Sequence, residues 1–229
     1  MKEKELFFSS IADDFDVLMN SYDLKRRLDI VFSDLMAQNI NGKLLLDMGC
    51  GTGWFSKRAA EAGAKVVSFD ISRKLVSKAQ QKVPSMPIVG NALCLPFSGA
   101  SFDIVVSSEV IEHTVSPASA VLELARVLKT NGILLLTCPN KKWNWLVSLA
   151  SLLRVRPYHG YENFPGFLEL EDHVKQAGLK IDTHKGFHPW PFQIRYLQPL
   201  SVRVDRFFGC GIWGRYMINQ AILAHKDSE

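Results

Sequence analysis

The sequence has few cysteines, no long apolar run and no leader-like N-terminus. Its four cysteines (Cys50, Cys94, Cys138 and Cys210) are scattered, and no two form a CxxC pair or a zinc-ligand spacing. This distribution argues against a disulfide framework and favours a reducing compartment, so we expect a cytoplasmic protein. The longest near-apolar run, Trp143 to Leu153, covers 11 residues, whereas a membrane-spanning helix needs about 20. The N-terminus also lacks the apolar core of a signal peptide.

A large charge excess is absent as well. The net charge is +4, and residues 1–140 carry fifteen basic and fifteen acidic side chains, whereas residues 141–229 carry twelve and eight. The excess therefore lies in the last third of the chain, where it forms either a solvated face or a contact with an anionic substrate or a membrane surface. We expect no nucleic-acid partner.

Strand-like and helix-like segments alternate along the chain. This alternation predicts right-handed crossovers and an α/β fold with a doubly wound, seven-stranded, mostly parallel sheet in three layers. We expect strands at 43–47, 64–70, 86–92, 101–109, 133–139, 179–185 and 215–226, and helices within 6–40 and at 54–62, 73–82, 117–128 and 167–177.

The length of 229 residues favours a single domain with added elements. We divide it into an N-terminal helical cap (1–40), a ligand-binding core (41–140), substrate-side elements with the sixth strand (141–211) and the last strand (212–229). The stretches 141–166 and 187–211 are aromatic and irregular, and the first is expected to form a helical insert after strand five.

The most informative motif is LLLDMGCGTGW at 44–54. A strand ends in Asp47, and Gly49, Gly51 and Gly53 follow at alternate positions, where glycine lets the backbone turn sharply and approach a ligand closely. A nicotinamide-binding G-x-G-x-x-G turn would place its third glycine at 54, which is Trp54. A dinucleotide turn binds a pyrophosphate anion, whereas Asp47 suits a ligand with an ammonium group, such as S-adenosylmethionine (SAM).

A second acidic residue ends the next predicted strand. Asp70 lies 17 residues after Gly53, where a carboxylate can accept hydrogen bonds from both hydroxyls of a ribose. The alternative is a charge at a helix N-terminus, because Ser72 begins the following helix.

These motifs resemble the class I SAM-dependent methyltransferases, and in particular the ubiquinone-type O-methyltransferases. DMGCGTG is similar to their first motif and VVSFD to their acid-ended second strand. VGNALCLPFSGASFDIVVSSEVIEH resembles the family pattern G-D-A-x-x-L-P-F with F-D-x-V and x-x-E-V-L-E-H, and RVLKTNGILLLTCPN resembles the entry to its fifth strand. The resemblance covers about residues 40–140.

The resemblance implies SAM as cofactor, S-adenosylhomocysteine as product and specific contacts. It places Asp47, Gly49, Cys50, Gly51 and Gly53 around the methionine part of SAM and Ser108 beside it. Asp70 and Ile71 would meet the ribose and the adenine edge, and Asn91, Ala92 and Leu93 the adenine. The family usually has Asp where this chain has Asn91. Helices at 6–40 resemble an N-terminal lid, in which Phe15 or Tyr22 closes over the cofactor.

Methyl transfer requires a nucleophile held about 3 Å from the methyl group in the absence of water. A base is needed only if the acceptor must lose a proton. No [DN]PPY follows the fourth strand, which argues against nucleobase amino groups as acceptors. Oxygen is the first choice of acceptor atom and carbon the second. His113 and His159 are the candidate bases, and each can instead brace a loop. His184 and His188 are expected to pack structurally.

A metal site is a weaker alternative at the exit of strand four. Glu109, Glu112 and His113 are spaced i, i+3 and i+4, which places them on one face if this turn is helical. Carboxylates with an imidazole could then hold Mg²⁺ or Zn²⁺. The main expectation is that no metal is bound.

The sequence thus predicts a SAM-dependent methyltransferase acting on a small or lipid-like acceptor. The apolar insert, with basic residues at its ends, could cover such a substrate or make peripheral membrane contact through 141–156. The alternatives are a non-catalytic SAM-binding module and, against the Trp54 argument, an NAD(P)-binding oxidoreductase. The sequence does not indicate an oligomeric state.

Overall fold

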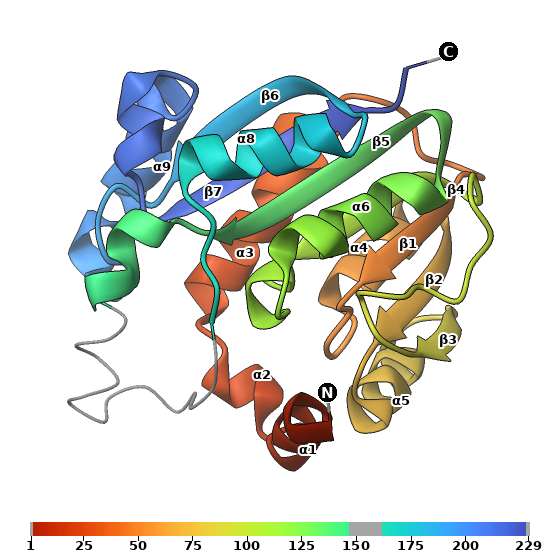
Figure 1. Ribbon diagram of the computed structural model, residues 1–229. Coiled ribbons are helices and arrows are strands. Elements are labelled where there is room, and N and C mark those ends of the chain that lie inside the picture. The colour runs from red at the N-terminus through yellow and green to blue at the C-terminus, as the bar shows by residue number, and fades with distance from the viewer. Residues whose placement is uncertain (1, 147–161, 228–229) are drawn as a thin grey trace.

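A seven-stranded sheet forms the centre of the computed structural model, which describes residues 2–146 and 162–227 (Figure 1). The strand order is β3-β2-β1-β4-β5-β7-β6, and β7 runs antiparallel to both of its neighbours while the other paired strands are parallel. The predicted α/β fold with a mostly parallel sheet is confirmed. The strands are β1 (Leu44–Met48), β2 (Lys65–Asp70), β3 (Met86–Val89), β4 (Phe102–Ser108), β5 (Leu128–Pro139), β6 (Lys180–Phe187) and β7 (Asn219–His225).

Helices cover both faces of this sheet, and short polar caps set where several of them begin. The Ser72 hydroxyl accepts a hydrogen bond from the Leu75 amide, and Ser116 does the same for Ser119 just before Pro117. The α-helices are α1 (Lys2–Ser10), α2 (Phe15–Leu18), α3 (Ser21–Asp29), α4 (Trp54–Glu61), α5 (Arg73–Lys82), α6 (Pro117–Val127), α8 (Phe167–Gln176) and α9 (Gln198–Phe208). The shorter turns are η1 (Ile30–Leu35), η2 (Ile111–His113), η3 (Lys141–Trp143), η4 (Arg195–Leu197) and η5 (Ile212–Tyr216).

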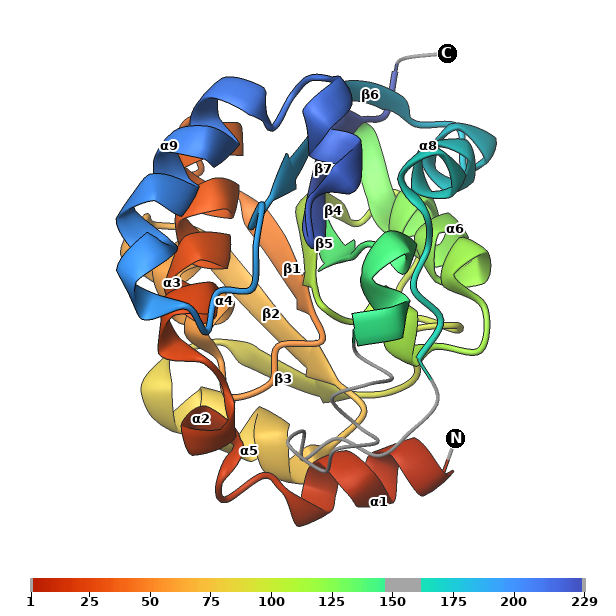
Figure 2. The same ribbon diagram turned by 90° about the vertical axis from the view of Figure 1, so that its left-hand side faces the viewer.

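Two apolar cores lie on opposite faces of the sheet because neighbouring residues of a strand point to opposite sides. In β1, Leu46 packs into the core that includes α6 and α8, and Leu45 into the core that includes η1 and α4. Both leucines are fully buried. The result is the three-layer arrangement visible in Figures 1 and 2.

The structure departs from the sequence expectation at several elements, and β5, for example, begins at Leu128 rather than at 133. The stretch 187–211 is not irregular throughout, because it contains the helix α9. The last strand begins at Asn219 rather than at 215, since η5 precedes it. The N-terminal helices begin earlier than 6, since α1 starts at Lys2; α2 and α3 follow, and α3 passes into the π-helical η1.

Among the described residues, no helix is both long enough and apolar enough to cross a membrane.

Candidate active site

The glycine turn lies where β1 ends, between β2 and β4 in the sheet. Gly49, Gly51 and Gly53 all have positive φ angles, of 79°, 52° and 89°, which L side chains rarely adopt. A Cβ at Gly53 would lie 2.8 Å from Cα of Ala79 in α5, and one at Gly49 would overlap the Val110 side chain. These glycines therefore allow both the turn and its close packing against neighbouring elements.

Two buried carboxylates flank this turn. The Asp47 carboxylate accepts a hydrogen bond from the Ser56 hydroxyl at 2.6 Å, and Asp70 accepts one from the Gly51 amide at 3.0 Å. Burial raises the pKa of Asp47 to about 7, and it also raises the pKa of Asp70. Neither forms an ion pair within the described part of the chain. A buried acid pair without a cationic partner fits a cationic ligand.

Asp70 also shapes the turn that it was predicted to serve. Its second carboxylate oxygen accepts the Ser72 amide at 2.9 Å, so each oxygen already has one backbone donor. A carboxylate oxygen has a second lone pair, and the ribose role therefore remains open to it. Asp70 also fits the alternative prediction, a charge near a helix N-terminus, because Ser72, two residues later, caps α5.

The N-terminal segment lies over the turn, as Figure 2 shows for α1 and α2 beside α5. A Cβ at Gly51 would be 3.2 Å from the Phe15 ring. Asp16 accepts hydrogen bonds from Thr52, from Trp54 at 3.0 Å and from Lys82 at 2.6 Å. Phe15 is thus placed where the lid prediction put an aromatic ring. Tyr22, the other candidate, donates its hydroxyl hydrogen bond to the Gln198 carbonyl at the start of α9.

The residues predicted to meet adenine follow β3. Asn91, Ala92 and Leu93 are partly buried, and the Asn91 side-chain oxygen accepts the Leu93 amide at 3.1 Å. The Gly90 amide donates to the Asp70 carbonyl. The segment is therefore adjacent to the end of β2, where Asp70 and Ile71 lie.

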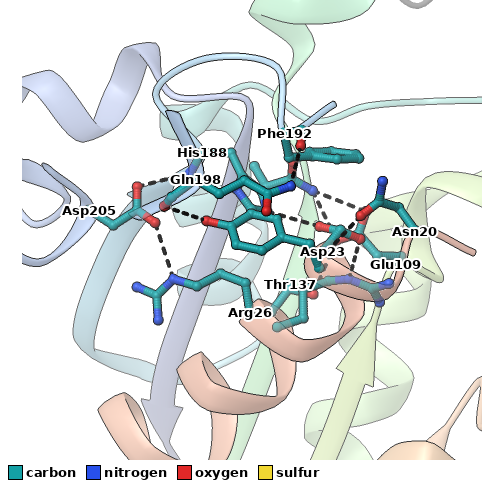
Figure 3. A network of polar contacts seen from close by, with 12 residues as sticks. Asn20, Asp23, Arg26, Glu109, Thr137, His188, Phe192, Gln198 and Asp205 are labelled. Carbon is teal, nitrogen blue, oxygen red and sulfur yellow. Dashed lines mark hydrogen bonds and ion pairs between the residues drawn. The ribbon is translucent and has the colours of Figure 1, made fainter. Parts of the chain in front are cut away.

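A network of charged and polar side chains lies at the carboxyl ends of β4 and β5 (Figure 3). Arg27 donates from Nε to Asp23 at 2.9 Å and from Nη1 to the Ser108 hydroxyl at 3.0 Å. Ser108 also pairs with the Thr137 hydroxyl at 2.9 Å. Ser108, predicted beside the methionine part of SAM, is thus linked to helix α3 through a buried arginine.

Glu109 lies in the same network and has a strained backbone. Its φ is 57°, uncommon for a residue with a side chain. Its carboxylate accepts hydrogen bonds from Thr137 at 3.2 Å and from Asn219 at 3.3 and 3.2 Å. Burial raises the pKa of Glu109 to about 7, although the charge of Arg27 opposes the shift. The residue as a whole is partly exposed, but its carboxyl group is desolvated, and this burial brings its pKa near neutrality.

The proposed metal ligands do not share a helical face. Glu109 has a left-handed backbone, and η2 is a 3-10 turn rather than an α-helix. Glu112 is 1% exposed, and burial raises the pKa of its carboxyl group well above the ordinary value. His113 packs edge-on against Phe8 of α1. Within residues 2–146 and 162–227, no group of three or more His, Cys, Asp and Glu side chains is arranged to hold a metal ion.

The other histidines divide by position. His159 and residues 147–161 of the insert lie outside the described residues. His184 stacks on Phe167 and hydrogen-bonds Glu171 and Gln220. His188 is fully buried, and its Nε2 is 3.0 Å from Asp23.

Sequence reasoning missed Asp23, Arg27, Thr137 and Asn219 as site residues. A signal existed for two of them: Asp23 and Arg27 are spaced i, i+4 and alternate with Leu24 and Leu28 in a helix. They therefore lie beside its apolar face, where unpaired charges would be costly. Thr137 and Asn219 come together only through the pairing of β5 with β7.

Known proteins share both this sequence pattern and this fold. Residues 46–136 match the model of the methyltransferase domain family. A ubiquinone biosynthesis O-methyltransferase of Bordetella pertussis is 31% identical over 182 residues, which cover 74% of this chain and 75% of that protein. The chain belongs to the SAM-dependent methyltransferases. The cofactor is therefore SAM.

Other relatives differ in length and in the reactions that their names state. The biotin biosynthesis bifunctional protein BioHC of Cellvibrio japonicus is 32% identical over 74% of this chain, but the match covers only 35% of that protein. Magnesium protoporphyrin IX methyltransferase of Synechocystis, solved with bound S-adenosylhomocysteine, has the same fold. Its TM-score is 0.68 at 20% identity, and the match covers 99% of each chain.

Proposed function

We propose that the protein transfers the methyl group of SAM to a hydroxyl oxygen of a small or lipid-like acceptor. The observation that carries this proposal is the pair of buried carboxylates on the three-glycine turn, Asp47 and Asp70, which have no cationic partner among residues 2–146 and 162–227. The resemblance to ubiquinone biosynthesis O-methyltransferases supports oxygen as the acceptor atom.

The turn and the two acids would hold the cofactor. Asp47 would pair with the ammonium group of its amino-acid part, and Asp70 would accept hydrogen bonds from the ribose hydroxyls. Asn91, Ala92 and Leu93 would line the adenine side, and Phe15 would cover the turn. Bound SAM supplies an electrophilic methyl group on a sulfonium, which the acceptor oxygen takes by in-line displacement.

Glu109 would accept the proton that the acceptor hydroxyl loses. Glu109 directly follows the carboxyl end of β4, and burial raises the pKa of its carboxyl group to about 7. A base with a pKa near the working pH is effective in proton transfer. Thr137 and Asn219 would orient the carboxylate, and Arg27 would favour its charged form. In this proposal His113 braces the contact between η2 and α1.

The test has two stages. First, SAM, NADH and NADPH are added separately and the melting temperature is followed, since a ligand at a hundred times its Kd stabilises the fold by about 2.7 kcal/mol. Stabilisation by SAM alone, lost in Asp70→Ala, is expected. Second, release of S-adenosylhomocysteine is measured with panels of phenols, alcohols and amines.

Turnover with hydroxyl compounds is the expected outcome of the second stage. Turnover with amines alone would overturn the acceptor atom. Saturable SAM binding without turnover on any panel would favour a non-catalytic SAM-binding module.

A further inference from the structure

A surface rich in exposed aromatic and arginine side chains lies on α9 and η5, away from the glycine turn. We call it the α9–η5 face. Its apolar members include Phe207, Ile212 and Trp213, whose exposed fractions are 79%, 66% and 64%. Such large side chains, exposed together rather than singly, mark an interaction site. The face is formed by Leu200, Arg203, Arg206, Phe207, Phe208, Ile212, Trp213, Arg215 and Tyr216.

The charge on this face has one sign. Between residues 189 and 217 the chain has four arginines and a single acidic residue, Asp205. Asp205 is fully buried, where it accepts a hydrogen bond from Arg26 at 3.2 Å and one from the His188 amide at 3.0 Å. No acidic side chain of this segment therefore reaches the surface to balance the four exposed arginines.

Helix α9 divides into an anchoring side and an outward side. Ser201 and Asp205 are buried, whereas Leu200, Arg203 and Phe207, spaced i, i+3 and i+7, are exposed along one stripe. In Figures 1 and 2, α9 lies at the outer edge of the molecule, where it is attached next to β6. The outward stripe is thus fixed in orientation by the buried ion pair behind it.

The face continues onto η3 and opens into a cavity. Lys142 lies over the Tyr216 ring at 4.4 Å, and Trp143 donates to the Tyr216 carbonyl at 2.8 Å. A cavity of about 410 Å³ is lined by Pro189, Val204, Phe208, Trp213, Tyr216 and Met217. Its lining is almost entirely apolar, and three of its residues (Phe208, Trp213 and Tyr216) also belong to the exposed face.

We infer that the α9–η5 face docks on an anionic lipid bilayer. Tryptophan and tyrosine favour the boundary between headgroups and acyl chains, phenylalanine and isoleucine favour its apolar side, and arginines favour anionic headgroups. A protein partner carries charges of both signs and would be matched by a face with both, whereas the α9–η5 face exposes arginines and no acidic side chain. The cavity behind Trp213 would accept part of an acyl chain. This inference does not depend on which acceptor atom is methylated.

The test is co-sedimentation of the full chain with vesicles. One set contains phosphatidylglycerol and phosphatidylcholine in equal parts, and the other contains phosphatidylcholine alone. The parent protein should bind only the anionic vesicles. The double variant Arg203→Glu with Arg206→Glu should lower the partition coefficient by at least about 30-fold, because each basic residue near an anionic surface contributes about fivefold. Phe207→Ser with Trp213→Ser should also release the protein.

A matched variant controls for net charge. Arg58 and Lys65 are exposed on the α4–β2 side, and Arg58→Glu with Lys65→Glu changes the charge by the same amount. This control variant should keep most of the parent's binding to anionic vesicles. Far-ultraviolet circular dichroism of each variant verifies that it is folded.

Three outcomes would overturn the inference. The parent protein could fail to bind anionic vesicles, or the Arg58 and Lys65 control could lose as much binding as the Arg203 and Arg206 variant. Analytical ultracentrifugation could also show a dimer that Trp213→Ser dissociates, in which case the face joins two copies of the chain.

Discussion

His188 and Asp23 are 165 residues apart in the sequence, yet Nε2 of His188 lies 3.0 Å from Oδ1 of Asp23. The other Asp23 oxygen accepts from Nε of Arg27 at 2.9 Å. This one carboxylate therefore connects α3 to His188, which follows β6 (Figure 3). Through Arg27 it also connects α3 to Ser108 at the end of β4. The N-terminal cap is attached to the carboxyl end of β4 by buried charges rather than by apolar contacts alone.

Replacing Asp23 by alanine should destabilise the protein by about 3–5 kcal/mol, because it removes the ion-pair partner of the buried Arg27 guanidinium. Arg27 is only 8% exposed as a side chain. The free energy of unfolding in urea measures the loss. Lys25→Ala serves as the control, since it removes the exposed pair Lys25–Asp29 and should cost at most about 1 kcal/mol. Equal losses in the two variants would contradict the buried-pair explanation.

Replacing Gly53 by alanine tests the close approach of the turn to α5. The new Cβ would lie 2.8 Å from Cα of Ala79 and would also be strained by a φ of 89°. Gly178→Ala is the control, because Gly178 has a φ of 76° but a Cβ added there would meet nothing within 4 Å. Its loss of stability comes from backbone strain alone and should be about 1 kcal/mol. Gly53→Ala should cost more than Gly178→Ala and should also weaken SAM binding. The melting temperatures and SAM titrations of the two variants give the comparison.

The cofactor half of the site was predictable from the sequence because its determinants are local. The strand, the acid and the alternating glycines at 44–54 lie in one continuous segment, and strand-end positions of parallel strands meet at one edge of a sheet. Asp70 lies near this turn because it ends β2, which pairs with β1. The sheet and its mostly parallel order followed from the strand–helix alternation.

The acceptor half was less predictable because its contacts are long-range. Glu109 meets Asn219 only when β7 inserts antiparallel between β5 and β6, which no local pattern announces. Helix α9 was missed because Pro199 and the surrounding aromatic residues look like an irregular segment. In the fold, Pro199 lies in the first turn of the helix, where its missing amide hydrogen costs nothing.

Replacing Glu109 by glutamine tests its role as the proton acceptor. In the parent, methyl transfer should rise with pH and level off above about 7, because the carboxyl group must be ionised to accept a proton. Glu109→Gln should lower kcat by about 10²–10⁴-fold and remove this pH dependence. Thr137→Val should keep the dependence but move it to higher pH, because the hydrogen bond from Thr137 lowers the pKa of Glu109. An unchanged pH profile in Glu109→Gln would exclude the role.

SAM affinity itself should depend on pH through Asp47. Burial holds the pKa of this carboxyl group at about 7 in the protein without ligand, and pairing with the ammonium of SAM requires the charged form. The Kd of SAM should therefore rise about tenfold per unit of pH below about 7, and binding at pH 7 should release about half a proton. Calorimetry in buffers of different ionisation enthalpy measures both quantities.

Because the folded-state pKa of Asp47 is raised, the contribution of this residue to the free energy of unfolding is present below its ordinary pKa and is lost as pH rises through about 7. Asp47→Asn should bind SAM weakly with a flat pH dependence and should lack this stability change, whereas a pH-independent Kd in the parent would show that Asp47 does not pair with the ammonium.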